Sequence, residues 1–367
     1  MKFRCERDNL LDALATAGRA GSTRSGAGAG VPGTRLSLSG DRLEVTGTDQ
    51  DLTISTGVVV AGASDGVVVA PGRLLTDIVR ALEPGAVDLE GDDEELRVAA
   101  GRSQFVLRPY RAGDFPHLAP PSGQRVSLST AGLAEALRQV VRAASSEDTR
   151  PVLTGVLIAA EAEGLRLVAT DSYRLAVRDL PGAHGVLAEG QRVLVPSRAL
   201  GELQRLLGGE AEAVELHLGT HEVRFSVGHV QMTTRLIEGE FPPYRQLVPF
   251  NYPNRLVISR EPFLDAIRRV RLVARDATTP ARISLRSGAV QLSVVTNDWG
   301  QAVEEVDAKY DGAEMTIAFN PQYLAEGVEA VPGDEVLLET MDALKPATLK
   351  PTDSTDYVYL LMPVRVA

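Results

Sequence analysis

The chain has 367 residues, of which 44% are hydrophobic and 24% are charged, an ordinary balance for a globular protein. This composition excludes a wholly disordered chain, a collagen and a coiled coil. The formal net charge is −11, from 38 basic and 49 acidic residues, so any nucleic-acid contact requires a local basic surface within an acidic protein.

The opening sequence, MKFRCERDNL, is charged and lacks the apolar centre of a secretory signal. No window approaches the ~18 consecutive apolar residues that a membrane helix needs. The single cysteine, Cys5, excludes an internal disulfide and a multi-cysteine zinc site. We therefore expect a cytoplasmic protein without a membrane partner and with one inert thiol.

The first third of the chain predicts two helices and several strands. Residues 9–20 carry apolar side chains at helical spacing, and the run at 43–49 reads as a strand that ends in Thr-Asp. A second apolar run ends at Pro71, where we place the start of a helix that stops at Pro84-Gly85. A proline-rich joint follows at 109–123.

The remaining two thirds repeat this order. A helical pattern at 131–145, a strand ending in Thr-Asp at 165–171 and a helix opened by Pro196 come first, with alternating strands after them. A second proline-rich joint occupies 239–254. The third copy has a helical pattern at 262–276, a strand-like run at 292–298 and a helix opened by Pro321.

The spacing of these markers predicts a triplicated domain. The repeated prolines are 125 and 125 residues apart, and the repeated threonines are 122 and 126 apart: Pro71, Pro196, Pro321, Thr48, Thr170 and Thr296. This period is too long for a solenoid unit. We predict an α+β fold of three similar domains, 1–122, 123–250 and 251–367, each with two helices and antiparallel sheets.

Three segments carry a family resemblance: TDSYRLAVRD at 170–179, EGEFPPYRQLVP at 238–249 and YVYLLMPVRV at 357–366. With the three repeats, they make the chain similar to the bacterial DNA polymerase III β subunit, the sliding clamp. The resemblance implies a homodimer whose chains close head to tail into a ring around duplex DNA. It also implies a non-enzymatic processivity factor without cofactor or metal, associated with the nucleoid.

The resemblance implies a pocket between the second and third domains that takes a short apolar peptide from each partner. The partners implied are the polymerase α subunit, the clamp loader, repair proteins and other clamp-motif proteins. Leu, Pro and adaptable Met suit such a concave apolar surface. The matching positions are Leu153, Thr170, Ser172, Tyr173, Arg174, Leu175, Pro242, Gln246, Leu247, Leu360, Leu361, Met362, Pro363, Val364 and Arg365. An alternative interpretation of the last segment is a plain final strand.

Arginines in the predicted helices are the candidates for contact with DNA. A ring holds DNA topologically, so a few non-specific phosphate contacts suffice and permit sliding. Arg73 and Arg198 occupy the same place in two repeats, two residues after the opening proline. The full candidate set is Arg24, Arg73, Arg80, Arg138, Arg142, Arg150, Arg198 and Arg205. Solvated helix faces are the alternative explanation for each of them.

The resemblance also implies that the first domain of one chain meets the third domain of its partner. The apolar candidates are Phe105 and Leu107 on an edge strand, facing Leu272 and Val273. Arg102 would pair with Glu304 or Glu305. Pairing between strand edges would extend the sheet and remove two exposed edges. Ordinary core packing is the alternative for the apolar residues.

The first repeat departs from the family at 25–33, where Gly and Ala replace an apolar segment and predict a loop. This departure, with Gln246 and Tyr173 in the pocket, raises a second hypothesis. The chain would then be a specialised clamp copy that is insensitive to clamp-binding peptide antibiotics. A third hypothesis, an unknown enzyme, lacks a catalytic constellation.

Two further motifs match the pattern of a binding site but lack its structural context. GAGVPG at 28–33 satisfies the G-x-G-x-x-G pattern, but a helical pattern precedes it and a strand follows, the reverse of a dinucleotide site. His217 and His221 are four residues apart but not on a helix, so a zinc site is not expected. Asp171 and Asp298 end repeated strands and are expected to be turn residues.

Overall fold

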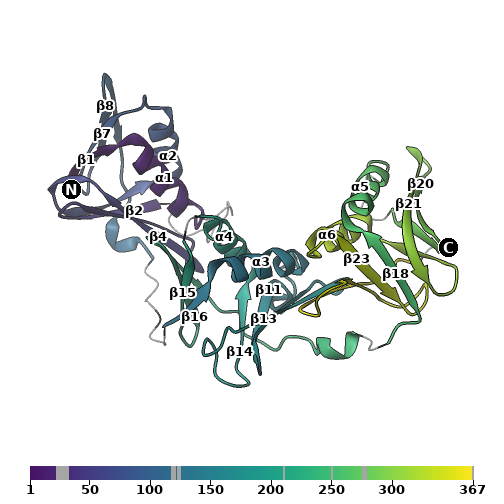
Figure 1. Cartoon of the computed structure of the whole chain (residues 1–367). Coiled ribbons are helices and arrows are strands. Elements are labelled where there is room, and N and C mark those ends of the chain that lie inside the picture. The colour runs from purple at the N-terminus through teal and green to yellow at the C-terminus, as the bar shows by residue number, and fades with distance from the viewer. Residues whose placement is uncertain are drawn as a thin grey trace. The chain divides into compact units, whose positions relative to one another are not determined.

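The computed structural model describes residues 1–21, 33–116, 121, 125–209, 211–248, 251–274 and 279–365 (Figure 1). The chain forms two compact units. Unit 1 combines Met1–Ala131 with Glu202–Leu236, and unit 2 combines Gly132–Gly201 with Ile237–Ala367. Helices α3 (Thr130–Val140) and α4 (Ser197–Leu206) each cross this division along the chain.

Unit 1 contains two antiparallel sheets, ordered β5-β1-β7-β8-β9 and β10-β15-β16-β17-β4-β3-β2-β6. The strands of the first sheet are β1 (Lys2–Glu6), β5 (Ala61–Ser64), β7 (Ala86–Gly91), β8 (Leu96–Ala100) and β9 (Ser103–Leu107). Those of the second are β2 (Gly33–Ser39), β3 (Arg42–Thr48), β4 (Leu52–Val59), β6 (Gly66–Pro71), β10 (Arg125–Ser129), β15 (Ala213–Leu218), β16 (Glu222–Val227) and β17 (Val230–Arg235).

Helices α1 (Arg7–Gly18) and α2 (Gly72–Ala81) pack on each other and on these strands. In α2 the buried side chains Leu75, Ile78 and Val79 form one helical stripe, and the exposed Arg73 and Arg80 lie off it. Burial of this stripe holds the helix against the sheet and leaves its charged side to solvent.

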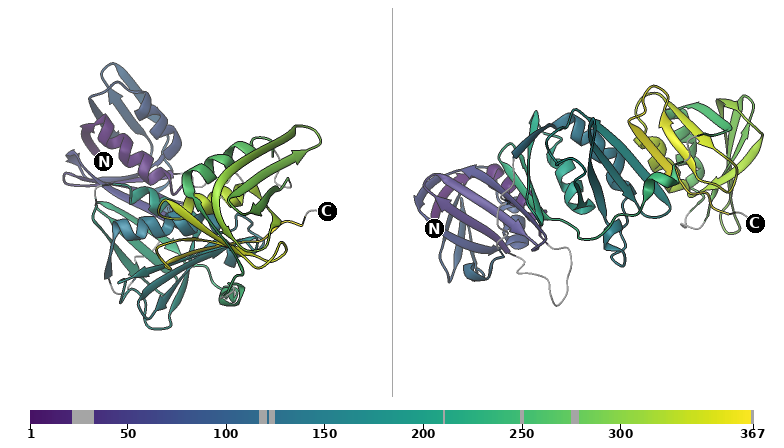
Figure 2. Two further views of the ribbon diagram at one scale, coloured as in Figure 1. Left: turned by 45° about the vertical axis from the view of Figure 1, so that its right-hand side comes forward. Right: turned by 90° about the horizontal axis from the view of Figure 1, so that it is seen from below.

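Unit 2 contains one antiparallel sheet of twelve strands, ordered β14-β11-β12-β13-β25-β24-β23-β18-β21-β20-β19-β22. The strands are β11 (Gly155–Glu161), β12 (Gly164–Thr170), β13 (Arg174–Pro181), β14 (Arg192–Pro196), β18 (Asn254–Ser259), β19 (Ala281–Arg286), β20 (Ala289–Thr296), β21 (Gly300–Asp311), β22 (Met315–Phe319), β23 (Glu335–Thr340), β24 (Ala347–Pro351) and β25 (Tyr357–Leu361). Figure 2 shows α5 (Arg260–Arg271) and α6 (Pro321–Ala330) side by side against this sheet.

All six predicted helices are present in the described part of the chain. The expectation for the prolines is correct only for Pro321, which is the first residue of α6. Pro71 and Pro196 instead end the strands β6 and β14, one residue before their helices begin. Pro71 has ψ 94°, so it still belongs to the extended backbone, and the helix starts at Gly72.

Strand pairs join one sequence repeat to the next. In unit 1, β17 of the second repeat pairs with β4 of the first. In unit 2, β13 of the second repeat pairs with β25 of the third. Neighbouring repeats therefore share sheets, and the division into compact units passes through the middle repeat. The compact units do not follow the sequence repeats, so the domain boundaries predicted at 122 and 250 stay a prediction.

Among the strand edges without a neighbour in the described residues, two belong to β9 and β21. β9 is the last strand of its sheet. β21 pairs with β20 over residues 300–307 and with β18 only over 308–311, so the outer edge of its first eight residues is unpaired. Unpaired edges offer backbone N–H and C=O groups to another chain.

Across the described residues, no helix has the length and apolar character for crossing a membrane.

Candidate functional site

The repeated Thr-Asp motif folds into a turn in both units. Thr170 Oγ1 donates to the carbonyl of Arg174 at 2.6 Å, and Asp171 Oδ1 accepts from the N–H groups of Tyr173 and Arg174 at 2.9 and 3.0 Å. In the first repeat, Thr48 Oγ1 donates to Leu52 at 3.1 Å in the same way. The prediction that Asp171 is a turn residue is confirmed. We call residues 170–174 the rim turn.

Arg174 is buried at the end of the rim turn and bonds in several directions. Its Nε donates to Asp171 Oδ2 at 3.0 Å, and its other nitrogens donate to Glu326 of α6 and to the backbone carbonyl of Arg142. The guanidinium also lies 4.2 Å from the ring centroid of Tyr323. Arg174 therefore ties three separate segments of unit 2 together and is a structural centre rather than a free recognition group.

The apolar pocket candidates divide into a buried and an exposed set. The buried set supports the surface from below: Leu153, Leu175, Leu360 and Leu361, with Thr170 beside them. The exposed set is Tyr173 at 60%, Leu247 at 51% and Met362 at 41%, from three different segments. Met362 N–H donates to the carbonyl of Tyr173 at 2.9 Å, so two of these side chains are adjacent. Such exposed apolar side chains can anchor a short peptide.

The remaining pocket candidates surround these side chains along the chain. Pro242, Pro363 and Val364 are half-buried, whereas Ser172, Gln246 and Arg365 are exposed. Val364 N–H donates to the carbonyl of Ala318 at 2.8 Å, which holds the last segment against the third repeat.

The joint after the second repeat positions Leu247. Its short helix, Tyr244–Leu247, is held by the buried ring of Tyr244, which packs with Leu175 and Leu360, and by an ion pair between Arg245 and Glu161. Leu247 then projects outward at the end of this helix. The sequence motif located the segment, and the buried packing of Tyr244 holds it in place.

Leu344 is an apolar candidate that the sequence analysis missed. It is 68% exposed in a turn closed by Asp342, whose Oδ1 accepts from the N–H groups of Leu344 and Lys345. The turn leads into β24, where Ala347 pairs with Leu361. No sequence marker separates this turn from an ordinary hairpin, so only the strand pairing reveals that it leads to the strand beside Met362.

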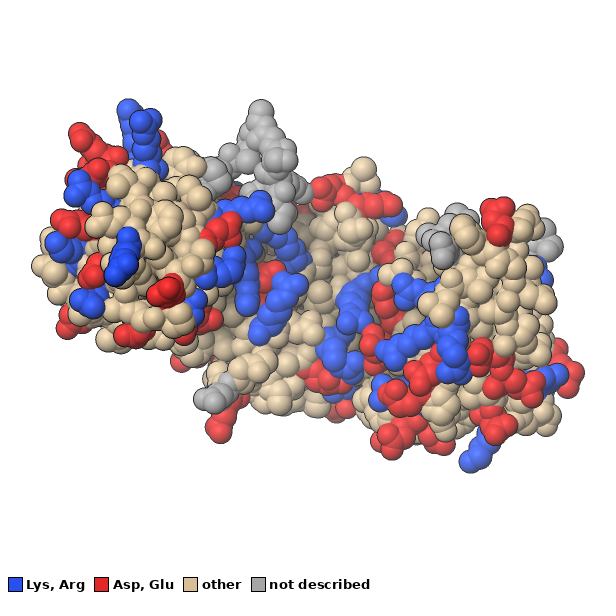
Figure 3. Space-filling view, turned by 90° about the horizontal axis from the view of Figure 1, so that it is seen from above, with Lys and Arg blue, Asp and Glu red and all other residues tan. Residues whose placement is uncertain are grey.

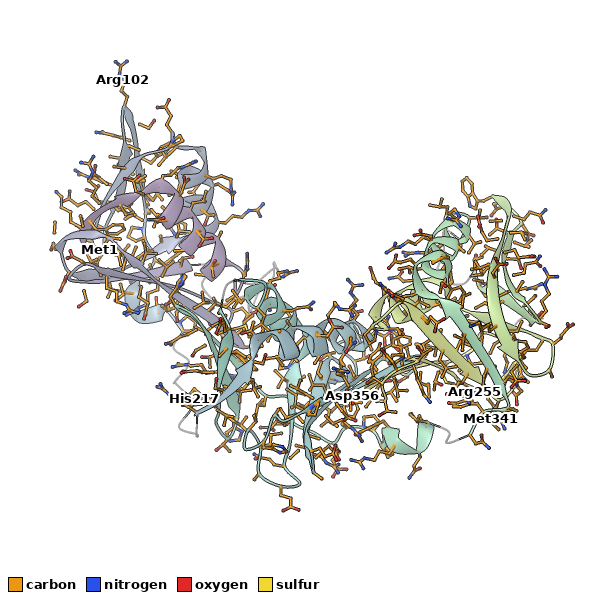
Figure 4. All side chains as sticks on the ribbon, in the orientation of Figure 1. Met1, Arg102, His217, Arg255, Met341 and Asp356 are labelled. Carbon is orange, nitrogen blue, oxygen red and sulfur yellow. The ribbon has the colours of Figure 1, made fainter. Side chains whose placement is uncertain are left out.

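The predicted dimer residues fall partly on an exposed edge. β9 exposes Phe105 and Val106, the latter at 62%, while Leu107 is buried in the core of unit 1. Leu107 therefore adds little contact area, and Val106 is the residue that the sequence analysis missed. Arg102 stands at the tip of the β8–β9 hairpin and points away from it (Figure 4). In unit 2, Leu272 is exposed and Val273 is half-buried.

Both carboxylates proposed to meet Arg102 have arginine partners in their own chain. Glu304 accepts from Arg269 Nε and Nη2, both at 2.9 Å, and Glu305 pairs with Arg286. The hydrogen bonds from Arg269 lower the pKa of Glu304. A partner arginine would therefore join an existing pair and would not find a free carboxylate.

The candidate phosphate contacts also differ in availability. Arg73 and Arg198 are exposed, and Arg80 and Arg205 are exposed but paired with Asp77 and Glu202 one helical turn away. The exposed pair of Arg80 with Asp77 is weak and exchanges readily, whereas the Glu202 side chain is itself only 13% exposed. Figure 3 shows cationic and acidic side chains interspersed on one face of the molecule. Arg24 lies outside the described residues.

Arg138 has a structural role. It makes a bidentate pair with Glu135 at 2.8 and 2.7 Å, and it donates to the carbonyls of Glu329 and Ala330 at 3.0 and 3.1 Å. These carbonyls are the last of α6, where a cation satisfies unpaired acceptors and the helix dipole. The hydrogen bond with Arg138 lowers the pKa of Glu135. We therefore leave Arg138 out of the proposed phosphate contacts.

Arg142 and Arg150 extend from the segment that follows α3. Arg142 pairs with Glu329 at 2.6 Å, and Arg150 Nη1 donates to Ser172 Oγ at 2.9 Å. A cavity of about 90 Å³ near Arg142 is lined by the same ion-pair network, including Arg174 and Glu326. Two candidate phosphate contacts thus touch the network that holds the rim turn.

The described residues contain no cluster of His, Cys, Asp and Glu that could hold a metal ion. His217 accepts from Arg125 Nε at 3.0 Å, and burial followed by the nearby Arg125 lowers its pKa. His117 and most of the G-x-G-x-x-G decoy lie outside the described residues, but its last residue, Gly33, begins strand β2 rather than a helix.

Models of the DNA polymerase III β subunit match the chain in three consecutive parts. The N-terminal, central and C-terminal domains match residues 1–119, 127–243 and 245–365. The β sliding clamp of Streptomyces coelicolor is 34% identical over 380 residues and covers 100% of both chains. That of Caulobacter vibrioides is 32% identical over 90% of this chain and 91% of its own.

Solved structures of sliding clamps have the same fold as this chain. The C. crescentus β sliding clamp has a TM-score of 0.91 at 32% identity, covering 100% of this chain and 99% of its own. The sliding clamp of Bartonella birtlesii, solved bound to griselimycin, has a TM-score of 0.92 at 30% identity, covering 100% of both chains. The prediction of three such domains in an α+β fold is confirmed, and the hypothesis of a specialised resistant copy is not favoured.

Proposed function

The chain belongs to the bacterial DNA polymerase III β subunit family, the sliding clamps, and from this premise we propose which of its residues do the clamp's work. It is a non-catalytic processivity factor, and the family implies a homodimeric ring with DNA and polymerase as partners. Our proposal concerns the partner pocket, the closure of the ring and the contacts with DNA. We place this work in the cytoplasm, at the nucleoid.

We propose that partner peptides bind over Tyr173, Leu247 and Met362. The observation that carries this proposal is the exposure of three large apolar side chains on segments that meet at a buried layer including Leu175 and Leu360. A peptide that covers them removes their apolar surface from water, worth roughly 25 cal/mol for each Å² buried. The polymerase α subunit, the clamp loader and other clamp-motif proteins are the proposed partners.

A peptide antibiotic is a further proposed ligand of the same surface. The Bartonella clamp was solved bound to griselimycin. Flexible Met362 and amphipathic Tyr173 suit a surface that accepts different ligands in turn.

We propose that the ring closes by pairing β9 of one chain with β21 of the other. Each internal junction pairs the strand after a Thr-Asp turn with the last strand of the following repeat: β4 with β17, and β13 with β25. In the third repeat the strand after this turn is β21, and the last strand of the first repeat is β9. Both strands keep a free edge among the described residues, as do other sheet-end strands such as β5 and β14.

The internal junctions also give a register. Leu52 pairs with Thr234, and Arg174 pairs with Leu361. Leu52 and Arg174 both lie four residues after the turn threonine, so each junction starts at the same place in its repeat. Once the first residue pair of two antiparallel strands is known, every following residue pair along the strands is determined.

The register transfers to the contact between two chains. Gly300 lies four residues after its turn threonine, and Leu107 matches Leu361 because each directly precedes a residue followed by proline. Pairing Gly300 with Leu107 places Glu305 opposite Arg102 on the same face of the sheet, while Glu304 lies one residue away on the other face. The arginine would join the existing pair of Glu305 with Arg286, which supports the predicted contact between the domains.

We propose that duplex DNA is held by Arg73, Arg80, Arg142, Arg198 and Arg205, and that Arg150 also reaches a phosphate. All five side chains are exposed. Asp77 and Glu329, the partners of Arg80 and Arg142, are solvated and compete poorly with phosphate, whereas Glu202, the partner of Arg205, is only 13% exposed. The contacts are few, which suits a protein that must slide.

Fluorescence polarisation with a labelled peptide carrying the polymerase's clamp-binding motif tests the pocket. We expect saturable binding to the full chain and a loss of about tenfold or more in Met362→Ala, because a central anchor contributes more than about 1.4 kcal/mol. Val295→Ala, another exposed apolar side chain on β20, is the matched control and should bind as the wild type does. Equal affinity for Met362→Ala and the control would refute the pocket.

A further inference from the structure

Ser172 adopts a backbone conformation that most side chains avoid. Its φ is +80°, in the left-handed region that favours glycine. Gln50 has φ +82° at the matching place in the first repeat, so the shape of the turn imposes this conformation. What distinguishes Ser172 is its side chain, because its Oγ receives a hydrogen bond from Arg150 Nη1 at 2.9 Å. A strained turn is thus tethered by a residue 22 positions away.

The tether connects to the exposed part of the pocket through adjacent residues. Tyr173 follows Ser172 directly, and its carbonyl accepts from Met362 N–H. Arg174 comes next and bonds the carbonyl of Arg142, at the other end of the segment that carries Arg150. The rim turn is therefore held to this segment at two points, and only the Arg150 point is made by an exposed side chain.

Arg150 is weakly engaged for a guanidinium. Its only other partner within the described residues is Glu147, at 3.7 Å, and both side chains are largely solvated. Its close acceptor, Ser172 Oγ, is neutral. A phosphate offers charge and bidentate geometry, which make a stronger acceptor for arginine than a hydroxyl. A DNA phosphate within reach would therefore replace Ser172 Oγ as the hydrogen-bond acceptor of Arg150.

We propose that Arg150 is a positioning residue of the partner pocket that DNA competes for. In the DNA-free clamp it holds the rim turn in the form that binds peptide. A phosphate withdraws the guanidinium, the strained turn loses its tether, and Tyr173 and Met362 lose their fixed placement. Peptide and DNA then weaken each other's binding by the same factor, as thermodynamic linkage requires. This inference rests on the proposed pocket and DNA contacts.

The test measures peptide affinity by polarisation with the full chain, in the absence and presence of a saturating short DNA duplex. One hydrogen bond is worth about 0.5–1.5 kcal/mol, so we expect DNA to raise the peptide Kd of the wild type about two- to tenfold. Arg150→Gln should bind peptide with this raised Kd from the start, and DNA should not raise it further. Ser172→Ala keeps the backbone strain, removes the acceptor and should also abolish the effect of DNA on peptide affinity.

Arg198→Gln is the matched control. It removes another exposed arginine from the proposed DNA contacts, so it should weaken DNA binding and still show the raised peptide Kd at DNA saturation. An unchanged wild-type Kd with DNA, or an equal DNA effect in Arg150→Gln, would overturn the inference. If Met362→Ala abolishes peptide binding in the same assay, the pocket stands and only the role of Arg150 fails.

Discussion

Arg174 donates a hydrogen bond to the backbone carbonyl of Arg142, 32 residues earlier in the chain. The same guanidinium pairs with Asp171 and Glu326 and is almost fully buried, so the rim turn, the end of the α3 segment and α6 share one cation. A buried cation with several carboxylate partners is costly to remove, because the carboxylates stay behind without compensation.

We predict that Arg174→Gln destabilises the protein by about 3–5 kcal/mol, since it leaves Asp171 and Glu326 facing each other's charge in a buried site. Chemical denaturation followed by circular dichroism measures this. Arg245→Gln is the control, because its pair with Glu161 is exposed and should be worth less than about 1 kcal/mol. Similar losses in the two variants would contradict the structural role of Arg174.

Val106→Glu should dissociate the dimer. The side chain is exposed on the free edge of β9, and a charge there would be buried against β21 of the partner. Light scattering should report the mass of one chain, 39.2 kDa, in place of two. Val59→Glu, at an even more exposed valine at the end of β4, should remain dimeric. A dimer in Val106→Glu would refute the proposed edge.

Arg198→Glu should shorten the retention of the clamp on circular DNA and leave the peptide affinity unchanged. Arg198 is exposed at the start of α4, where a reversed charge repels phosphate. The control is Arg282→Glu, on β19, whose neighbours Ala281 and Ile283 are buried, so that Arg282 points away from the core. Unchanged retention in Arg198→Glu would show that this part of α4 does not meet DNA.

Cys5 should resist thiol reagents at pH 8 in the folded protein. Burial, and then the charges of Glu6 and Asp88, raise the pKa of its thiol to about 12, so the reactive thiolate is scarce. Because the pKa is raised in the folded state, the free energy of unfolding falls as pH rises from about 9 toward 12. One equivalent of thiol should react with Ellman's reagent only after denaturation; rapid labelling of the native protein would contradict the buried placement.

Much of the fold follows from local sequence. Apolar spacing located α1, α3 and α5, the repeated prolines located α2, α4 and α6, and the repeated threonines located equivalent turns, because all these signals arise from residues within a few positions of each other. Leu344 and Val106 were missed for the opposite reason. Their exposure depends on which strands pair beside them, and no local pattern encodes that.

The sequence by itself determined the repeats, the helix faces and the segments of the pocket, since side-chain periodicity and turn chemistry are short-range properties. Only the tertiary structure decided which charged side chains form internal contacts and which stay exposed. Arg138, a candidate phosphate contact by its place on a helix, instead caps α6 at Ala330, 192 residues away. It likewise decided that repeats share sheets and that β9 and β21 keep free edges. Partners so distant in sequence meet only when the whole chain has packed, because burial and strand pairing, not local preference, select them.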